Sequence, residues 1–354
     1  MKIEPNSSRI TLVLHLTIDF FKYLEKQIKI WEGPISVALV IPRAEVIKCP
    51  NNKIKLCGIY DEKNFIIFKI LYYFKKIFNP YKVSLHLLYD NDGINNCVPI
   101  IINEIKDNDN LMEKYKKGLE LGRKLPSPQK VYPINVARNI ARMGKKTELF
   151  LSSDIENFSS DKYETKVSKI ALKYLLEQKR KIVLVHRRFE YDIGASRPKN
   201  KKELKNLYIQ KKASMFHASF YMQAHYIPYI NQWMAVPEDD NVTSIFMTTN
   251  FTKYFWEPQF VGDNRVPYHL EEFPYRIRSN THLGILMCHQ EFRFAILNDV
   301  FMAHEGRRKK LNDNEEKSFK KGFNSIKKTI FDFNRWIKSN YPNMKKKCPS
   351  FLTA

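Results

Sequence analysis

Two acidic residues, Asp154 and Glu156, stand one residue apart directly after the apolar run 149–153. Such a run predicts a buried strand, and in an open α/β sheet ligands bind where the strands end. Two carboxylates at this spacing can both reach a hard divalent cation, which takes oxygen ligands and bridges them to phosphate. An Asp-x-Glu pair after a strand is more often a solvated turn, so the spacing alone leaves both interpretations open.

A histidine, His304, follows a second apolar run at 300–303, and Arg307 comes shortly after it. An imidazole nitrogen could complete a manganese site with the two carboxylates, because such a site accepts both oxygen and nitrogen ligands. A guanidinium just beyond the histidine could then contact a phosphate that the metal holds. The alternative is a packed or surface histidine followed by a solvated basic loop.

The elements that must position these side chains alternate along the first half of the chain. Apolar runs predict strands at 10–15, 35–42, 83–89 and 149–153, and apolar residues at helical spacing predict helices between them. Alternation of this kind is typical of an α/β fold with a mixed, mostly parallel central sheet.

The second half of the chain is less regular, with strands predicted at 181–185 and 292–297. Near the end, apolar residues fall on one helical face with lysines opposite, which predicts an amphipathic C-terminal helix. There is no linker long enough to separate two domains, so we expect a single domain at 8–310. The amphipathic helix and a basic tail, 311–354, would pack on that domain or trail from it. The apolar face of the helix contains Phe319, Phe323, Ile326, Ile330, Phe333 and Ile337.

Composition limits the possible classes of protein. The 354 residues include 60 Lys and Arg against 37 Asp and Glu, a net charge of +23, and 44% are hydrophobic, as in a folded chain. A basic nucleic-acid-binding protein is an alternative, but the basic runs are scattered and no arginine-rich helix is evident. The longest apolar run near the start, 10–18, is too short to span a bilayer, and no signal peptide or membrane anchor is recognisable in this chain.

Six segments of the chain follow one another in the order ITLVLHLTIDFFKYLEKQIKIWEGPISVALVIP, YPINVARNIAR, LFLSSDIENFSS, NKKELKNLY, WEPQFV and FRFAILNDVFMAHEG. Together they resemble the glycosyltransferase family that contains β-1,4-glucuronyltransferase 1 and the glucuronyltransferase domain of LARGE. The resemblance covers roughly 10–310 and implies a GT-A fold, a UDP-sugar donor, a glycan acceptor and a divalent cation, Mn²⁺ or another. It also implies the Golgi lumen, so this chain would be incomplete at its amino terminus or delivered without an anchor.

The resemblance assigns roles to individual residues. The metal would be held by an acidic DxD-type motif and a distant histidine. The reaction would be an inverting displacement on a UDP-sugar, with glucuronate in β linkage the best expectation, and it needs a carboxylate base. Metal ligands would be Asp154, Glu156 and His304; donor contacts Leu14, His15, Asn135, Arg138 and Arg307; base candidates Glu257, Glu271 and Glu272.

Three features depart from the family pattern. The second acid of the metal motif is Glu156 in place of aspartate, Leu270 replaces an acid in the segment 268–282, and the aromatic stretch 216–226 keeps two histidines but lacks the cysteines of relatives. These changes leave donor binding plausible and put acceptor recognition in question. A family member that binds UDP or glycan without turnover is therefore the alternative hypothesis.

Overall fold

The computed structural model of the protein describes residues 8–41, 62–79, 81–89, 109–125, 132–275, 277–308, 310 and 313–352. Its strands are β1 (Ile10–Leu16), β2 (Ile35–Val40), β3 (Val83–Leu88), β4 (Leu149–Ser152), β5 (Asn157–Ser159), β6 (Ile182–Tyr191), β7 (Ala213–Met215), β8 (Ile245–Thr249), β9 (Phe260–Gly262) and β10 (Arg293–Glu305). Its α-helices are α1 (Phe21–Ile30), α2 (Glu62–Ile77), α3 (Leu111–Gly122), α4 (Ile134–Met143), α5 (Tyr163–Ala171), α6 (Lys201–Ile209), α7 (Ile230–Ala235), α8 (Thr281–His289) and α9 (Asp313–Asn340).

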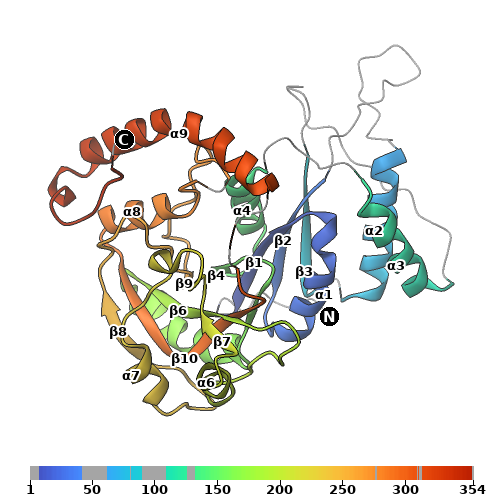
Figure 1. Cartoon of the computed structure of the whole chain (residues 1–354), viewed down its shortest axis with the longest axis horizontal. Helices are drawn as coiled ribbons and strands as arrows, with labels where there is room; N and C mark the ends of the chain where they lie inside the picture. The colour runs from blue at the N-terminus through green and yellow to red at the C-terminus, as the bar shows by residue number, and fades with distance from the viewer. Residues whose placement is uncertain are drawn as a thin grey trace.

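The described strands form one ten-stranded sheet in the order β3-β2-β1-β4-β9-β6-β10-β5, with β7 beside β6 and β8 beside β10 (Figure 1). Strands β1, β2, β3 and β4 run parallel, and β6 and β10 run parallel to each other. The short strand β9 lies antiparallel between β4 and β6, so the two parallel groups point the same way. The sheet is therefore mixed and mostly parallel, as the sequence predicts.

Strands β6 and β10 are longer than the apolar runs suggest. The runs at 292–297 and 300–303 belong to one strand, β10, whose pairing with β6 shifts register between Ile296 and Phe301. Strand β6 likewise continues past Val185, through two arginines, to Tyr191. Because both strands extend together, side chains near their carboxyl ends are brought beside the end of β4.

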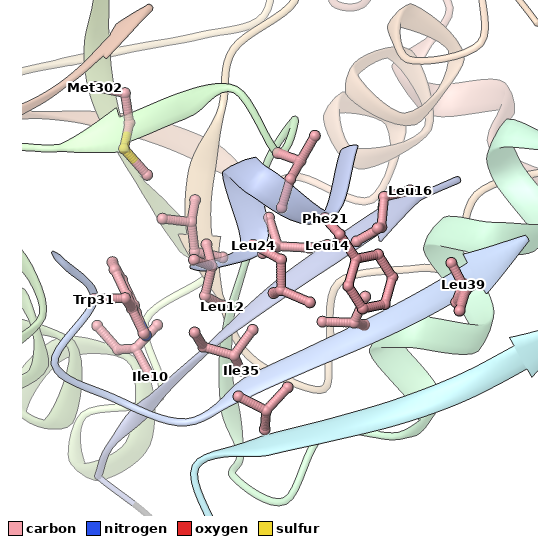
Figure 2. Close-up of a cluster of buried hydrophobic side chains, with 14 of the residues drawn as sticks. Ile10, Leu12, Leu14, Leu16, Phe21, Leu24, Trp31, Ile35, Leu39 and Met302 are labelled. Atoms are coloured by element: carbon pink, nitrogen blue, oxygen red, sulfur yellow. The ribbon is translucent and has the colours of Figure 1, made fainter. Parts of the chain in front are cut away.

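Both faces of the sheet are covered by helices, which explains the nearly continuous apolar strands. Alternate residues of β1 point to opposite faces. Leu12, Leu14 and Leu16 join the cluster under α1, where they pack with Phe21 and Leu24 (Figure 2). Residues of α2, α3 and α5 belong to that same cluster, whereas residues of α4, α8 and α9 line the other face.

The C-terminal helix α9 packs through the second half of its apolar face. Ile326, Phe333 and Ile337 are buried in the cluster that also contains residues of α8. A disulfide between Cys288 of α8 and Cys348 holds the tail that follows the helix. No described helix is both long and apolar enough to cross a bilayer.

Loss of the disulfide should destabilise the fold without altering the sheet. The bond joins residues 60 positions apart, and the loop-closure model gives about 4 kcal/mol for a loop of that size. Cys348→Ser and Cys288→Ser should each lower the denaturant midpoint by a similar amount, and the double variant should lose little more. A fully additive double variant, or midpoints equal to the wild type, would contradict this prediction. The measurement is urea unfolding followed by circular dichroism.

Candidate functional site

A cavity of about 1460 Å³ opens at the carboxyl ends of β1, β4 and β10 and beside the end of β6. It is lined by Asp154, Glu156 and His304, the three residues that the sequence predicts as metal ligands. They come from distant parts of the chain: the two acids follow β4, and His304 lies in β10 directly opposite Asn157 of β5. The structure thus places the carboxylate pair and the imidazole around one cavity.

Asp154 faces two guanidiniums. Arg138 Nη2 and Arg188 Nη1 each lie 3.9 Å from one of its carboxylate oxygens, and Asn157 Nδ2 donates to it at 3.4 Å. Burial alone would raise the pKa of Asp154, but Arg138 and Arg188 outweigh it and hold the pKa below its usual value. The side chain is still 43% exposed, so the ionised carboxylate is accessible from the cavity.

His304 has the tautomer that a metal ligand needs. Its Nδ1 lies 3.1 Å from the carbonyl oxygen of Gly306, which can only accept, so Nδ1 carries the proton and donates. In the neutral ring this leaves a lone pair on Nε2, the arrangement common among metal-ligating histidines. Two carboxylates and this nitrogen suit a divalent cation chemically. Among the described residues, however, no three acidic, histidine or cysteine side chains stand close enough to form a ready metal cluster.

Arg188 of β6 is a site residue that the sequence does not reveal. Its Nη2 donates to His225 Nδ1 at 2.6 Å, and the guanidinium lies 4.3 Å above the centre of the Phe216 ring. His225 Nε2 then lies 3.1 Å from His217 Nδ1, and His217 Nε2 is 3.9 Å from a carboxylate oxygen of Glu190. Because arginine can only donate, His225 Nδ1 must accept, and His225 Nε2 then donates to His217 Nδ1. His217 Nε2 carries the remaining proton and faces Glu190.

His217 and His225, the two histidines in this series of contacts, are neutral. Burial first, and then the charge of Arg188, lower the pKa of His217 to about 3 and that of His225 well below its ordinary value. Burial also raises the pKa of Glu190. Arg188 therefore keeps its full charge directed at Asp154 while uncharged neighbours fix its orientation.

Of the two donor contacts predicted in β1, His15 lines the cavity but Leu14 does not. Leu14 is fully buried in the core because neighbouring strand residues point to opposite faces. His15 lines the cavity with Leu16 and Thr17. Its Nδ1 is 2.9 Å from the hydroxyl of Tyr132, and its Nε2 is buried with no partner among the described residues. Burial, reinforced by nearby Arg138, lowers the pKa of His15 to about 4, so the ring is neutral.

Asn135 supports the site from behind and does not line the cavity. It is buried, donates to the carbonyl oxygens of Leu270 and Phe273, and accepts from Arg138 Nη1 at 3.2 Å. Arg138 also donates to the Ser279 carbonyl. These contacts hold the Arg138 guanidinium toward Asp154, although Arg138, like Asn135, does not line the cavity.

The three base candidates are separated by the structure. Glu257 lines the cavity, and burial raises its pKa although Arg188 and Arg138 act in the opposite direction. Glu271 and Glu272 are exposed and do not line the cavity, and Glu271 accepts a hydrogen bond from Asn139 instead. The loop that carries them is fastened to α4, which turns both carboxylates away from the site.

Arg307 lines the cavity, but its charge is already engaged. Its Nε lies 2.7 Å from a carboxylate oxygen of Asp192, and Nη2 donates to the carbonyl of Lys211. These contacts connect the end of β10 to the loop after β6. Arg188 and Arg138, not Arg307, are the guanidiniums that lie 3.9 Å from the Asp154 carboxylate.

Known proteins resemble this chain over nearly its whole length. Residues 9–342 match the family model described as glycosyl-transferase for dystroglycan. The chain belongs to this glycosyltransferase family. Human β-1,4-glucuronyltransferase 1 is 22% identical over 98% of this chain and 79% of its own length. The zebrafish (Danio rerio) protein of the same name is also 22% identical, over 98% of this chain and 77% of its own length.

A solved structure with a similar course is S. aureus TarS 1-349 in complex with UDP, 10% identical over 91% of this chain and 65% of that one, with a TM-score of 0.37. A likeness this low carries no information about the site. The family match and the observed sheet together confirm the predicted GT-A fold class and the prediction of a glycosyltransferase.

Proposed function

We propose that the protein is an inverting glycosyltransferase that moves a sugar, glucuronate by preference, from a UDP donor to a glycan acceptor with the help of Mn²⁺. The observation that carries this proposal is the convergence of Asp154, Glu156, His304, Arg188 and Glu257 on one cavity at the strand ends. The preference for glucuronate rests on the names of the relatives.

Each group has a role suited to its surroundings. Asp154, Glu156 and His304 would hold the cation, which when bound would act as a Lewis acid on the diphosphate. Arg188, with its guanidinium oriented by neutral neighbours, would stabilise negative charge that develops as UDP departs.

The acceptor hydroxyl must lose a proton as it attacks, and we assign that step to Glu257. A general base acts in its deprotonated form, so transfer should fail as the pH falls through its pKa. Because burial raises the pKa of Glu257, this acidic limb should lie at higher pH than for an ordinary glutamate.

Glu257→Gln should therefore lower kcat by about 10²–10⁴-fold and abolish the acidic limb of the pH–rate profile. Glu271→Gln and Glu272→Gln are matched controls, since both carboxylates lie outside the cavity, and each should keep wild-type kinetics. Steady-state UDP release from pH 4.5 to 8 measures all three. If Glu271→Gln or Glu272→Gln loses activity while Glu257→Gln does not, the assignment of the base is wrong.

The disulfide supports a secretory compartment, the Golgi lumen, for the reaction. Disulfides persist in oxidising compartments and are rare in the cytosol, and Cys288–Cys348 joins α8 to the tail after α9. We also propose that 8–310 is the catalytic domain and that 311–354 packs on it, since buried residues of α9 share a cluster with α8.

A UDP-release screen tests the proposed function. Wild-type protein is given UDP-glucuronate, UDP-xylose, UDP-galactose, UDP-glucose and UDP-N-acetylglucosamine, each with and without Mn²⁺ and with a mixture of glycan acceptors. The expected result is release from UDP-glucuronate that depends on Mn²⁺. Release from a different donor would overturn the sugar assignment. UDP binding without release from any donor would favour the non-catalytic alternative.

A further inference from the structure

The cavity is larger than its predicted donor groups require. Pockets for one small molecule commonly measure about 300–1,000 Å³, and this cavity measures about 1460 Å³. The part of the cavity wall made by α9 and by residues 220–221 has no role in the donor chemistry above. The segment that contains residues 220–221 begins beside the predicted metal site, since the Phe216 and His304 ring centroids are 6.0 Å apart.

Two sets of exposed aromatic rings line that part. From α9, Phe319 is 39% and Phe323 is 48% exposed, and their rings stack with centroids 6.2 Å apart. From the segment after β7, Phe220 and Tyr221 are 38% and 43% exposed. All four line the same cavity. Flat apolar rings that stay exposed in a cavity are suited to contact the apolar C–H faces of sugar rings.

Cations accompany the aromatics. Arg308, Lys310 and Lys327 line the same cavity, and the Arg308 guanidinium lies 4.9 Å from the centre of the Phe220 ring. Lys310 and Lys327 are exposed. Among the described residues, the carboxylates that line the cavity are those of Asp154, Glu156, Glu257 and Glu305. None of them comes from α9. The α9 side of the cavity therefore favours a ligand that carries negative charge.

We propose that the cavity-facing side of α9 is the wall of the acceptor site and that the acceptor is an acidic oligosaccharide of several sugar units. Phe319 and Phe323 would stack on sugar rings, and Lys327 would pair with a carboxylate on the chain. This inference rests on the proposed function, because an acceptor has meaning only for a transferase. It adds the acceptor's charge and the residues that select it.

The test is binding of the intact protein to an array of acidic and neutral oligosaccharides. The wild type should bind acidic glycans in preference to neutral ones. Phe319→Ala/Phe323→Ala should weaken binding by about tenfold or more, the loss expected when aromatic contact residues are truncated. Lys327→Glu should weaken binding to acidic glycans selectively.

Controls on the same helix separate this role from a general loss of structure. Trp336 is also exposed on α9 but does not line the cavity, so Trp336→Ala should bind like the wild type, and so should Lys338→Glu. Circular dichroism melting should show all variants folded, because the substituted side chains are exposed.

Several results would overturn the inference. These are unchanged glycan binding in Phe319→Ala/Phe323→Ala, a wild type that prefers neutral glycans or binds none, or a change of oligomeric state in that variant, which would make the face a contact between copies. UDP affinity, measured by calorimetry with MnCl₂, should not change in these variants. If the wild type binds no UDP but the variants still lose glycan binding, the proposed function fails and the glycan-binding wall stands.

Discussion

Asp154→Asn is expected to lower the rate of sugar transfer by about a thousandfold. The change removes a charged ligand from the predicted metal site and leaves Arg138 and Arg188 without the carboxylate that lies 3.9 Å from each. A loss of this size is typical when a preorganised electrostatic contact to the transition state is removed. UDP affinity should also cease to depend on Mn²⁺, because the amide is a much weaker ligand than the carboxylate.

Steady-state UDP release and calorimetry with and without MnCl₂ measure these two effects. The matched control is Asp240→Asn, a change at an exposed acid remote from the cavity lining, which should leave both quantities unchanged. Activity of Asp154→Asn within threefold of the wild type would show that Asp154 is not a metal ligand. Glu156 and His304 would then lose their assigned role as well.

Arg188→Met is expected to lower kcat by about a hundredfold or more and to weaken UDP binding even in the presence of EDTA. The guanidinium contacts the Asp154 carboxylate, His225 and the backbone carbonyl of Glu257 at once, so it joins the end of β4 to the segments that carry His225 and Glu257. The protein holds this charge buried beside the cavity, where an electrostatic contact is stronger than in water.

Arg188→Lys separates charge from geometry. Lysine keeps the positive charge but cannot donate to His225 and face Asp154 in the same planar arrangement, so activity between the wild type and Arg188→Met is expected. Arg180→Met, at an exposed arginine outside the cavity, is the control. Melting temperatures check that the site variants fold. A folded Arg188→Met with wild-type kcat and UDP affinity would exclude a role for Arg188 in donor chemistry.

Local patterns were sufficient for the strands that build the site. The apolar runs at 10–15, 35–42 and 149–153 correspond to β1, β2 and β4, because burial on both faces leaves a nearly continuous apolar sequence. The order of strands and helices also predicted the α/β class. The position of Asp154 and Glu156 followed from the same logic, since a strand end is visible in the sequence.

The alternation of side chains along a strand also predicts that Leu14 and His15 face opposite sides of the sheet. In β1, Leu12, Leu14 and Leu16 share one face, so Leu14 and His15 cannot both point into the cavity. Glu257 lies in the retained segment WEPQFV, which ranks it ahead of Glu271 in the diverged segment, but no sequence pattern shows which of the three glutamates faces the cavity. Their separation depends on Asn139 of α4, which donates a hydrogen bond to the Glu271 carboxylate.

The sequence alone determined the periodic elements, the family and the acids at the end of β4, because these depend on neighbouring residues. Only the tertiary structure decided that Arg188 belongs to the site, that Cys288 pairs with Cys348, and that α9 closes one side of the cavity. A charged residue inside a strand is stable only when distant groups compensate it, as Asp154 and His225 do for Arg188. Such compensation joins residues far apart in the chain, and no local pattern records it.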